Sequence, residues 1–288
     1  MNVYINKFYK FFNRKFIPNT KATVSILALI LYGIFIFFPM YWMFITAFKE
    51  PTIVMRIPPE LFPSSTSLEN FTYIFNRTQI FRWIWNSLLT SSIATLFYVF
   101  ICAMAGYSFA QKNFPGNKVI FWLYISTLML PYFSYLIPLY LLIVDFNFVN
   151  SYAGLILPAM SGPFGVFLMK QYMMNFPNEL IQAAKIDGCN EFRSFWQIVI
   201  PICKPAVSFL GIVVFISQWN NFLWPMIVIS SDRLRTIQVG IALFQQMSIT
   251  DYGATMAASV VAALPIIILF LIFQRNIISG INIGAIKG

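Results

Sequence analysis

The chain has 288 residues, of which 59% are hydrophobic and only 10% are charged, and its net charge is +10. Soluble domains carry about 25% charged residues, so this composition excludes a water-soluble globular domain. The sequence contains no histidine, which excludes nucleophilic catalysis by a Ser–His or Cys–His pair. Its three cysteines, Cys102, Cys189 and Cys203, form no ligand-spaced cluster, so neither a metal site nor a disulfide framework is expected.

Six windows of the sequence lack Asp, Glu, Lys and Arg, and each exceeds the roughly 20 residues that an α-helix needs to cross a bilayer. They are 22–48, 83–111, 119–144, 146–169, 205–231 and 252–274. The first window is longer than the apolar region of a signal peptide, about 7–15 residues, so we interpret it as a spanning helix. The sequence therefore predicts an all-α membrane protein with six transmembrane helices. It shows no internal repeat that would divide residues 1–288 into two domains.

The basic residues are distributed unevenly among the segments that connect these windows. If the N-terminus lies in the cytoplasm, the segments 1–21, 109–118, 170–204 and 275–288 are cytoplasmic, and they hold 13 of the 19 Lys and Arg residues. Cytoplasmic loops of membrane proteins carry such an excess, so we expect both termini in the cytoplasm. Nucleic-acid binding is disfavoured, because the charges are split among short loops rather than gathered on one face.

Several windows carry polar or helix-breaking residues. The fourth reads GLILPAMSGPFGVFLMK toward its end, with proline and glycine in the middle. The fifth carries Gln218, Asn220 and Asn221, and the second carries Asn86. Polar side chains at membrane depth face the bundle interior or an aqueous path, so we expect these four to line a solute path. The alternative for each is a hydrogen bond between helices. The two tryptophans of the stretch SQWNNFLWP either stack on a sugar face or anchor the helix at the membrane interface.

Two segments on the predicted outer side, 49–81 and 230–254, are too long to be simple turns. Either they dock an external soluble partner, or they pack on themselves as a cap over the bundle.

Residues 178–201, NELIQAAKIDGCNEFRSFWQIVIP, form a long polar stretch between two apolar windows. Asn178 is a good N-cap, Gly188 is placed to end a first helix in the left-handed conformation, and a second helix can begin after Asn190. One face of the first helix is small and shallow, and it consists of Leu180, Ala183, Ala184 and Asp187. The stretch predicts a cytoplasmic helical hairpin that presents this face to a partner. The alternative is an amphipathic helix lying on lipid.

The same stretch resembles the cytoplasmic signature of the membrane subunits of bacterial ABC importers, which has the form E-A-A-x3-G-x9-I-x-L-P. The matching positions are Gln182, Ala183, Ala184, Gly188, Ile198, Ile200 and Pro201. Gln182 stands where Glu is usual, and Ile200 stands where Leu is usual. Essentially the whole chain resembles the smaller permease subunit of the maltose-type carbohydrate importers, including FFPMYWMFITAFKEP at the first span, FLWP at 222–225 and GINIGAIKG at the C-terminus.

This resemblance implies a permease subunit that moves a sugar or oligosaccharide across the bacterial cytoplasmic membrane by alternating access. It implies pairing with a second, homologous permease subunit, with two ATPase subunits on the cytoplasmic side, and with an extracellular solute-binding protein. ATP and Mg would bind in the partner ATPase, in keeping with the absence of a Gly-Lys pair, and hence of a phosphate-cradling loop, from this sequence. The chain itself would hold no cofactor and no catalytic residue.

The resemblance also implies roles for particular residues. The first hairpin helix would be a coupling helix seated in a cleft of the ATPase, and the candidate coupling residues are Glu179, Gln182, Ala183, Ala184, Asp187, Gly188, Ile198 and Pro201. The loop before the last span would extend toward the binding protein, and its candidate contacts are Gln245, Gln246, Asp251 and Tyr252. In the path we favour Asn220, because Asn221 stands where family members often carry an acid. The C-terminal IGAIKG would reach toward the ATPase interface.

The sequence disfavours two other classes of protein. A stand-alone ion-coupled secondary carrier would need buried ionisable residues, and the six windows contain none. A membrane-embedded enzyme or scaffold is disfavoured by the missing histidine and by the lack of a carboxylate pair. Within the importer class, sugar chain length stays open, and phosphate-bearing polyols remain among the substrates.

Overall fold

The computed structural model describes residues 20–247 and 251–285, and within them it consists of helices and loops with one isolated β-bridge, between Lys49 and Thr66. The described part of the chain thus agrees with the all-α prediction. Residues 1–19 and 286–288 carry most of the basic N-terminal segment and the end of the IGAIKG tail. The predictions made for them lie outside the described residues.

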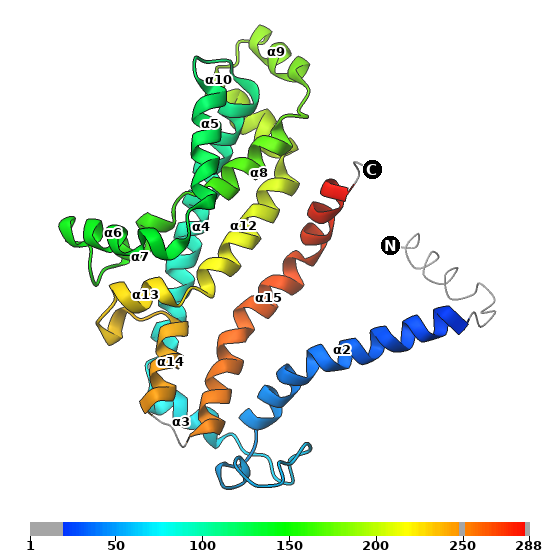
Figure 1. Cartoon of the computed structure of the whole chain (residues 1–288), viewed down its shortest axis with the longest axis vertical. Helices are drawn as coiled ribbons and strands as arrows, with labels where there is room; N and C mark the ends of the chain where they lie inside the picture. Colours follow the sequence, from blue (N-terminus) through cyan, green and yellow to red (C-terminus); the bar gives the residue numbers. More distant parts are fainter. Residues whose placement is uncertain (1–19, 248–250, 286–288) are drawn as a thin grey trace.

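The first third of the chain contains two long helices, and its elements are α2 (Thr20–Ala47), η1 (Pro51–Ile53), α3 (Glu69–Arg77) and α4 (Ile80–Gln111). The helix α4 is central, because it contacts α7, α8, α12 and α14. The helix α2 meets α15 near α3 and then diverges from the bundle (Figure 1). Its apolar side chains are largely exposed, so α2 presents an apolar surface to lipid or to another chain.

The middle of the chain is built from short helices, and they are α5 (Asn117–Ser126), η2 (Thr127–Met129), α6 (Tyr132–Asp145), α7 (Tyr152–Ile156), η3 (Leu157–Ala159) and α8 (Pro163–Met173). The chain turns by 104° before α6 and by 41° before α8. Pro131 and Pro163 stand at these two breaks, where a proline cannot extend the preceding helix. Window 119–144 is therefore not one straight helix but a bent pair, which passes the test for a membrane span only as a unit.

The last part of the chain begins with the predicted hairpin and ends with a long helix. Its elements are α9 (Asn178–Ile186), α10 (Glu191–Ser194), the π-helical turn η4 (Phe195–Val199), α11 (Ile200–Ile202), α12 (Lys204–Trp219), α13 (Leu223–Val228), η5 (Asp232–Leu234), α14 (Ile237–Met247) and α15 (Tyr252–Ala285). The window 205–231 is not one helix either. Asn220 and Asn221 lie in the break between α12 and α13 rather than inside a continuous span.

Three helices are long and apolar enough to cross a membrane, and three bent helix pairs pass the same test of length and composition. The long helices span 23–47, 80–111 and 252–274. The six predicted spans are therefore recovered if each bent pair crosses the membrane as one unit.

Three apolar clusters hold the helices together. One joins α4, α8, the hairpin and α12 around Met169, Val199 and Leu210. Another joins α3, α4, α14 and α15, and a smaller one joins α6, α7 and α13. The contact between α4 and α8 is so close that a Cβ added at Gly106 would lie 2.6 Å from the Cβ of Met169. Only glycine permits this approach of the two backbones.

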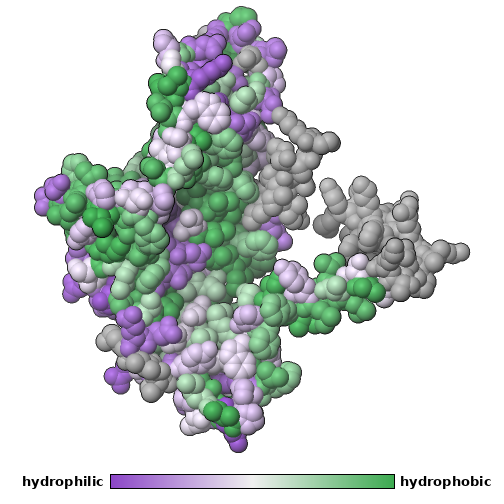
Figure 2. All heavy atoms as spheres, viewed as in Figure 1, coloured by the Kyte–Doolittle hydropathy of each residue, from purple (hydrophilic) through white to green (hydrophobic). Residues whose placement is uncertain are grey.

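The connecting segments gather at two ends of the bundle. The hairpin and the turn 112–116 lie at one end, which we call the hairpin end. The segments around α3 and α14 lie at the other, the loop end (Figure 1). Among the described residues, segments 109–118 and 170–204, which the charge pattern assigns to the cytoplasm, thus lie apart from segments 49–81 and 230–247 on the predicted outer side. Figure 2 shows hydrophobic side chains along α2 and the middle of the bundle, and hydrophilic ones gathered at the hairpin end.

Candidate functional site

The hairpin has the backbone that its sequence predicts, with one difference. Gly188 adopts φ +78° and ends α9 in the left-handed conformation. The carboxamide oxygen of Asn190 accepts a hydrogen bond from the backbone N–H of Arg193 at 2.8 Å and caps α10. Asn178, however, is the first helical residue rather than the N-cap, because Pro177 occupies the cap position.

The predicted small face of α9 is divided between two directions. Ala184 is only 4% exposed and packs toward the bundle together with Ile181. Ala183 and Leu180 are exposed, and Ile186 is 87% exposed. Gln182 and Asp187 are exposed as well. The prediction that Ala183 and Ala184 share one partner-facing surface was therefore wrong in this structure. Ala184 holds the helix to its own bundle, and Ala183 is the small residue left open.

The second helix anchors the hairpin through its apolar side chains. Phe195 and Val199 are buried in the cluster with α4 and α12. Phe192 is exposed, whereas Trp196 stacks on Phe100 of α4 with 5.8 Å between ring centroids. Of the three later signature positions, Ile198 and Ile200 are half-buried against this cluster and Pro201 is exposed.

A group of charged side chains ties the hairpin to the end of α4. Glu191 forms ion pairs with Lys112 and with Lys185 of α9, the latter at 2.9 Å, and accepts a hydrogen bond from the Tyr107 hydroxyl at 3.2 Å. Hydrogen bonds from Lys112 and Lys185 hold the pKa of Glu191 at about 2. A free Glu has a pKa of about 4.3. The ion pairs of Glu191 therefore stabilise the folded permease above about pH 4.3, and this stabilisation is lost as the pH falls toward 2. Glu191 is therefore charged throughout the neutral range.

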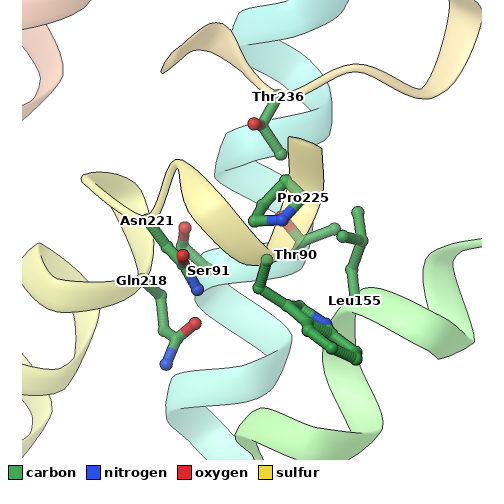
Figure 3. Close-up of a pocket in the computed structure, with 8 residues that line it drawn as sticks. Thr90, Ser91, Leu155, Gln218, Asn221, Pro225 and Thr236 are labelled. Atoms are coloured by element: carbon green, nitrogen blue, oxygen red, sulfur yellow. The ribbon is translucent and has the colours of Figure 1, made fainter. Parts of the chain in front are cut away.

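Polar side chains from four segments surround a small cavity near the middle of the molecule (Figure 3). Gln218 and Asn221 come from the end of α12 and the break after it, and they face polar side chains of α4 and of the loop before α14. Those side chains are Thr90, Ser91 and Thr236. The cavity measures about 10 Å³, which is about the room that one water molecule needs. Among the described residues, the buried Thr236 hydroxyl has no hydrogen-bond partner, so it is available to a guest in this cavity.

The structure separates the other two predicted path residues from this cavity. Asn220 is exposed, and its carboxamide donates a hydrogen bond to the Ile216 carbonyl at 2.9 Å. Asn86 is 0% exposed. Its amide donates to the carbonyls of Arg233 and Arg235, both at 2.9 Å. Its oxygen accepts from the Tyr152 hydroxyl at 2.7 Å. In this conformation Asn86 ties α4 to neighbouring segments, and its role in the path stays a prediction.

The two tryptophans beside the break are structural. The indole N–H of Trp219 donates to the Ala262 carbonyl at 3.2 Å, and that of Trp224 donates to the Gly154 carbonyl at 2.9 Å. Both rings are buried in the bundle. Neither a free stacking face nor an interfacial anchor, the two predicted roles, fits these positions.

The candidate contacts before the last span lie at the loop end. Gln245 and Gln246 are exposed at the end of α14, while Asp251 and Tyr252 are half-buried at the start of α15. The residues between them, 248–250, lie outside the described residues. The buried Phe244 fixes the preceding turn of α14 in the cluster with α3 and α15, so the two glutamines stand at the edge of a packed surface.

Comparison with known proteins assigns the chain to a family. Residues 99–283 match the family described as "Binding-protein-dependent transport system inner membrane component". Over 254 residues the chain is 35% identical to the arabinooligosaccharides transport system permease protein AraQ of Bacillus subtilis (strain 168), covering 87% of this chain and 90% of that protein. The chain belongs to this family. The permease is therefore an inner membrane component of a binding-protein-dependent transport system.

Other similarities agree with this assignment. The permease is 31% identical over 261 residues to the sn-glycerol-3-phosphate transport system permease protein UgpE of Yersinia enterocolitica serotype O:8, covering 88% of this chain and 93% of that one. A solved bacterial ABC transporter involved in the import of the acidic polysaccharide alginate has the same fold. Its chain matches with a TM-score of 0.78 at 19% identity, and the match covers 89% of this chain and 97% of that chain. The predictions of an all-α permease and of an ABC importer subunit are confirmed. The comparisons support the importer over the ion-coupled carrier.

Two features of these sites were not predicted from the sequence. The ion pairs of Glu191 involve Lys112, which lies 79 residues earlier in the chain, and no local pattern links the two. Thr236 contributes to the small cavity from a loop that was predicted to lie on the outer side. Nothing in the sequence distinguishes this threonine from other polar loop residues, so its place in the cavity could not be predicted.

Proposed function

We propose that this permease moves a sugar or sugar-derived solute, delivered by an external solute-binding protein, through a path that it forms with a second, homologous permease subunit. The observation that carries the proposal is the match to AraQ over most of both chains. Further support comes from the diacetylchitobiose uptake system permease protein NgcG of Streptomyces coelicolor, which is 28% identical over 270 residues. The solutes named for these relatives, arabinooligosaccharides and diacetylchitobiose, are rich in hydroxyl groups, and the sn-glycerol-3-phosphate of UgpE also carries hydroxyl groups.

We propose that α9 seats in a cleft of a separate ATPase subunit, which holds the ATP and Mg. Support comes from the exposed side chains of Leu180, Ala183 and Ile186 at the hairpin end. Two such ATPases would serve the two permease subunits. Their closure on ATP favours one state of the bundle, and hydrolysis releases it, which is alternating access by a population shift. In this arrangement the hairpin and both termini lie in the cytoplasm of a bacterial cell.

We propose that the loop end receives the binding protein, with Gln245, Gln246, Asp251 and Tyr252 near the contact. The exposure of the two glutamines supports this role. In this proposal the apolar surface of α2 contacts the second permease subunit and lipid.

The proposal is tested by reconstituting the permease with its second permease subunit, its ATPase and its binding protein in liposomes. A panel of arabinose-, glucosamine- and glycerol-based solutes is then screened for stimulation of ATP hydrolysis. We expect stimulation and uptake with one solute class only when all four components are present. Uptake by this chain alone would favour the ion-coupled carrier. ATPase stimulation by none of the hydroxylated solutes would reject the substrate class.

The small polar cavity predicts which residues at the end of α12 and in the break after it contact the solute. We expect Asn221→Leu and Gln218→Leu to lower uptake about tenfold or more, because each removes polar partners worth about 1.5 kcal/mol from the path. Assembly of the complex should be unchanged. The matched variant Asn220→Leu lies outside the cavity and should have a smaller effect. If uptake assays in liposomes rank the variants in the reverse order, the path follows the exposed side of the break and Asn220 lines it.

The left-handed backbone conformation of Gly188 predicts that a larger residue at this position impairs coupling between ATP hydrolysis and transport. Valine at φ +78° is strained, by roughly 1–2 kcal/mol or more, although open space surrounds Gly188. We expect Gly188→Val to misdirect α9 and to lower transport per ATP hydrolysed, with Gly188→Ala less affected. The ratio of uptake to phosphate release in liposomes measures this. An unchanged ratio for Gly188→Val would show that the turn does not set the orientation of α9.

A further inference from the structure

A second cavity, of about 710 Å³, opens at the hairpin end. Its walls are the end of α4, the turn 112–116, the first turn of α5 and the end of α8. It shares no residue with the small polar cavity, and α9 does not line it. Its volume falls in the range of small-molecule sites, about 300–1,000 Å³, so it has room for a ligand of that size.

The charge around this cavity is positive and only partly compensated. Lys112, Lys118 and Lys170 line it, together with no Asp or Glu. Lys112 is paired with Glu191. Within the residues that the structure describes, no carboxylate lies at ion-pair distance from Lys118 or Lys170. Two of the three ammonium groups thus have no anionic partner in the described part of the chain.

The positions of these two lysines favour an anion between them. The ammonium group of Lys170 lies 3.4 Å from the ring centroid of the buried Phe121. This contact is attractive but leaves the charge in place. Lys118 and Lys170 line the same cavity, so their like charges repel each other there. The first turn of α5 also lines the cavity, and the free backbone N–H groups of a helix start add positive potential.

The same cavity has an apolar side that continues down α5. Phe114, Val119 and Met174 line it and are exposed. The next turns of α5 expose further apolar side chains, namely Ile120, Trp122 and Leu123. A small inorganic anion would leave this apolar side in water. A ligand with a phosphate and hydrocarbon chains would cover both.

We propose that this cavity binds the headgroup phosphate of an anionic phospholipid from the cytoplasmic leaflet, with Lys118 and Lys170 at the phosphate and the acyl chains along α5. The inference rests on the proposed orientation, which puts the hairpin end in the cytoplasm. Anionic lipids attract basic side chains at this membrane surface, and basic pockets between helices there bind their headgroups. Because Lys112 lines the cavity and also pairs with Glu191, the bound lipid would lie beside the ion pairs that hold α9.

The test uses the assembled importer complex, washed free of lipid in detergent and then supplied with phosphatidylglycerol or phosphatidylcholine. Native mass spectrometry counts the bound lipids. We expect the double variant Lys118→Gln/Lys170→Gln to bind phosphatidylglycerol about 30-fold more weakly, since each lysine near an anionic headgroup contributes about fivefold. Phosphatidylcholine binding should be unchanged. The matched control Lys204→Gln removes an exposed lysine outside the cavity and should bind like the wild type.

Three results would overturn the proposal. In the first, the double variant retains wild-type affinity for phosphatidylglycerol. In the second, Lys204→Gln loses as much affinity as the double variant. In the third, inorganic phosphate stabilises the wild type against heat while phosphatidylglycerol does no more than phosphatidylcholine, which would identify a site for free phosphate. If the double variant does not assemble, the single variant Lys118→Gln at an exposed position tests the proposal. We expect its affinity for phosphatidylglycerol to fall about fivefold. Solute uptake by the wild type is measured separately, so failure of lipid binding does not bear on the transport function.

Discussion

Replacing Ala183 with Asp is expected to weaken association of the permease with its ATPase by at least about 100-fold. Ala183 is exposed on α9, so the new carboxylate meets water in the isolated subunit. In the proposed complex it would be buried without a partner, which costs about 3–5 kcal/mol, and every 1.4 kcal/mol is about a factor of ten in affinity. The measurement is a pull-down of the ATPase from detergent, where no bilayer surface remains.

Two matched variants show whether the loss belongs to the exposed face of α9. Asn175→Asp adds the same charge at an exposed position just before the hairpin, and it should leave association unchanged. Ala184→Asp places the charge on the buried side of the same helix, and it should destabilise the permease itself. If α9 lies on lipid instead, Ala183→Asp would retain the ATPase in detergent. That retention, with uptake intact, would reject the coupling role.

The hairpin shows which features can be predicted from sequence. Its turn and its second cap depend on local chemistry, because Gly188 supplies the left-handed conformation and Asn190 supplies the capping oxygen. The partner-facing side of α9 could not be predicted in the same way. Ala183 and Ala184 are adjacent and alike, and only the position of α9 against the bundle decides that Ala184 is buried.

The spans show the same division between local and tertiary information. Uncharged windows locate apolar segments, and three of them correspond to long helices in the structure. Where a window contains proline, its composition does not say whether the helix continues with a kink or turns by 104°, as it does before α6. That outcome depends on what packs against the break. Similarly, the amide of Asn86 signals a need for partners, but its acceptor on Arg233 lies 147 residues later in the chain.

Replacing Asn86 with Leu is expected to destabilise the permease by about 2–4 kcal/mol. The substitution leaves the Arg235 carbonyl and the Tyr152 hydroxyl without their present hydrogen bonds. Both residues are half-buried, so each lost bond costs about 1–2 kcal/mol, the lower part of the range for an unpaired buried polar group. The Arg233 carbonyl is spared, because it also accepts a hydrogen bond from the Arg82 side chain at 3.0 Å. We expect a lower thermal unfolding temperature for the purified complex and less permease in the membrane fraction.

A double variant tests the physical reason for this loss. Tyr152→Phe removes the hydroxyl that Asn86→Leu leaves unpaired, so the double variant should be no less stable than Asn86→Leu alone. The sum of the two single effects would then overestimate the loss, as expected for residues that share one hydrogen bond. A path role for Asn86 gives a different pattern, in which Asn86→Leu unfolds at the wild-type temperature and loses uptake. Thermal unfolding and uptake measured on the same preparations separate the two. The burial of Asn86 at 0% exposure favours the first result, because a side chain that no solvent reaches in this conformation acts through the segments it holds together.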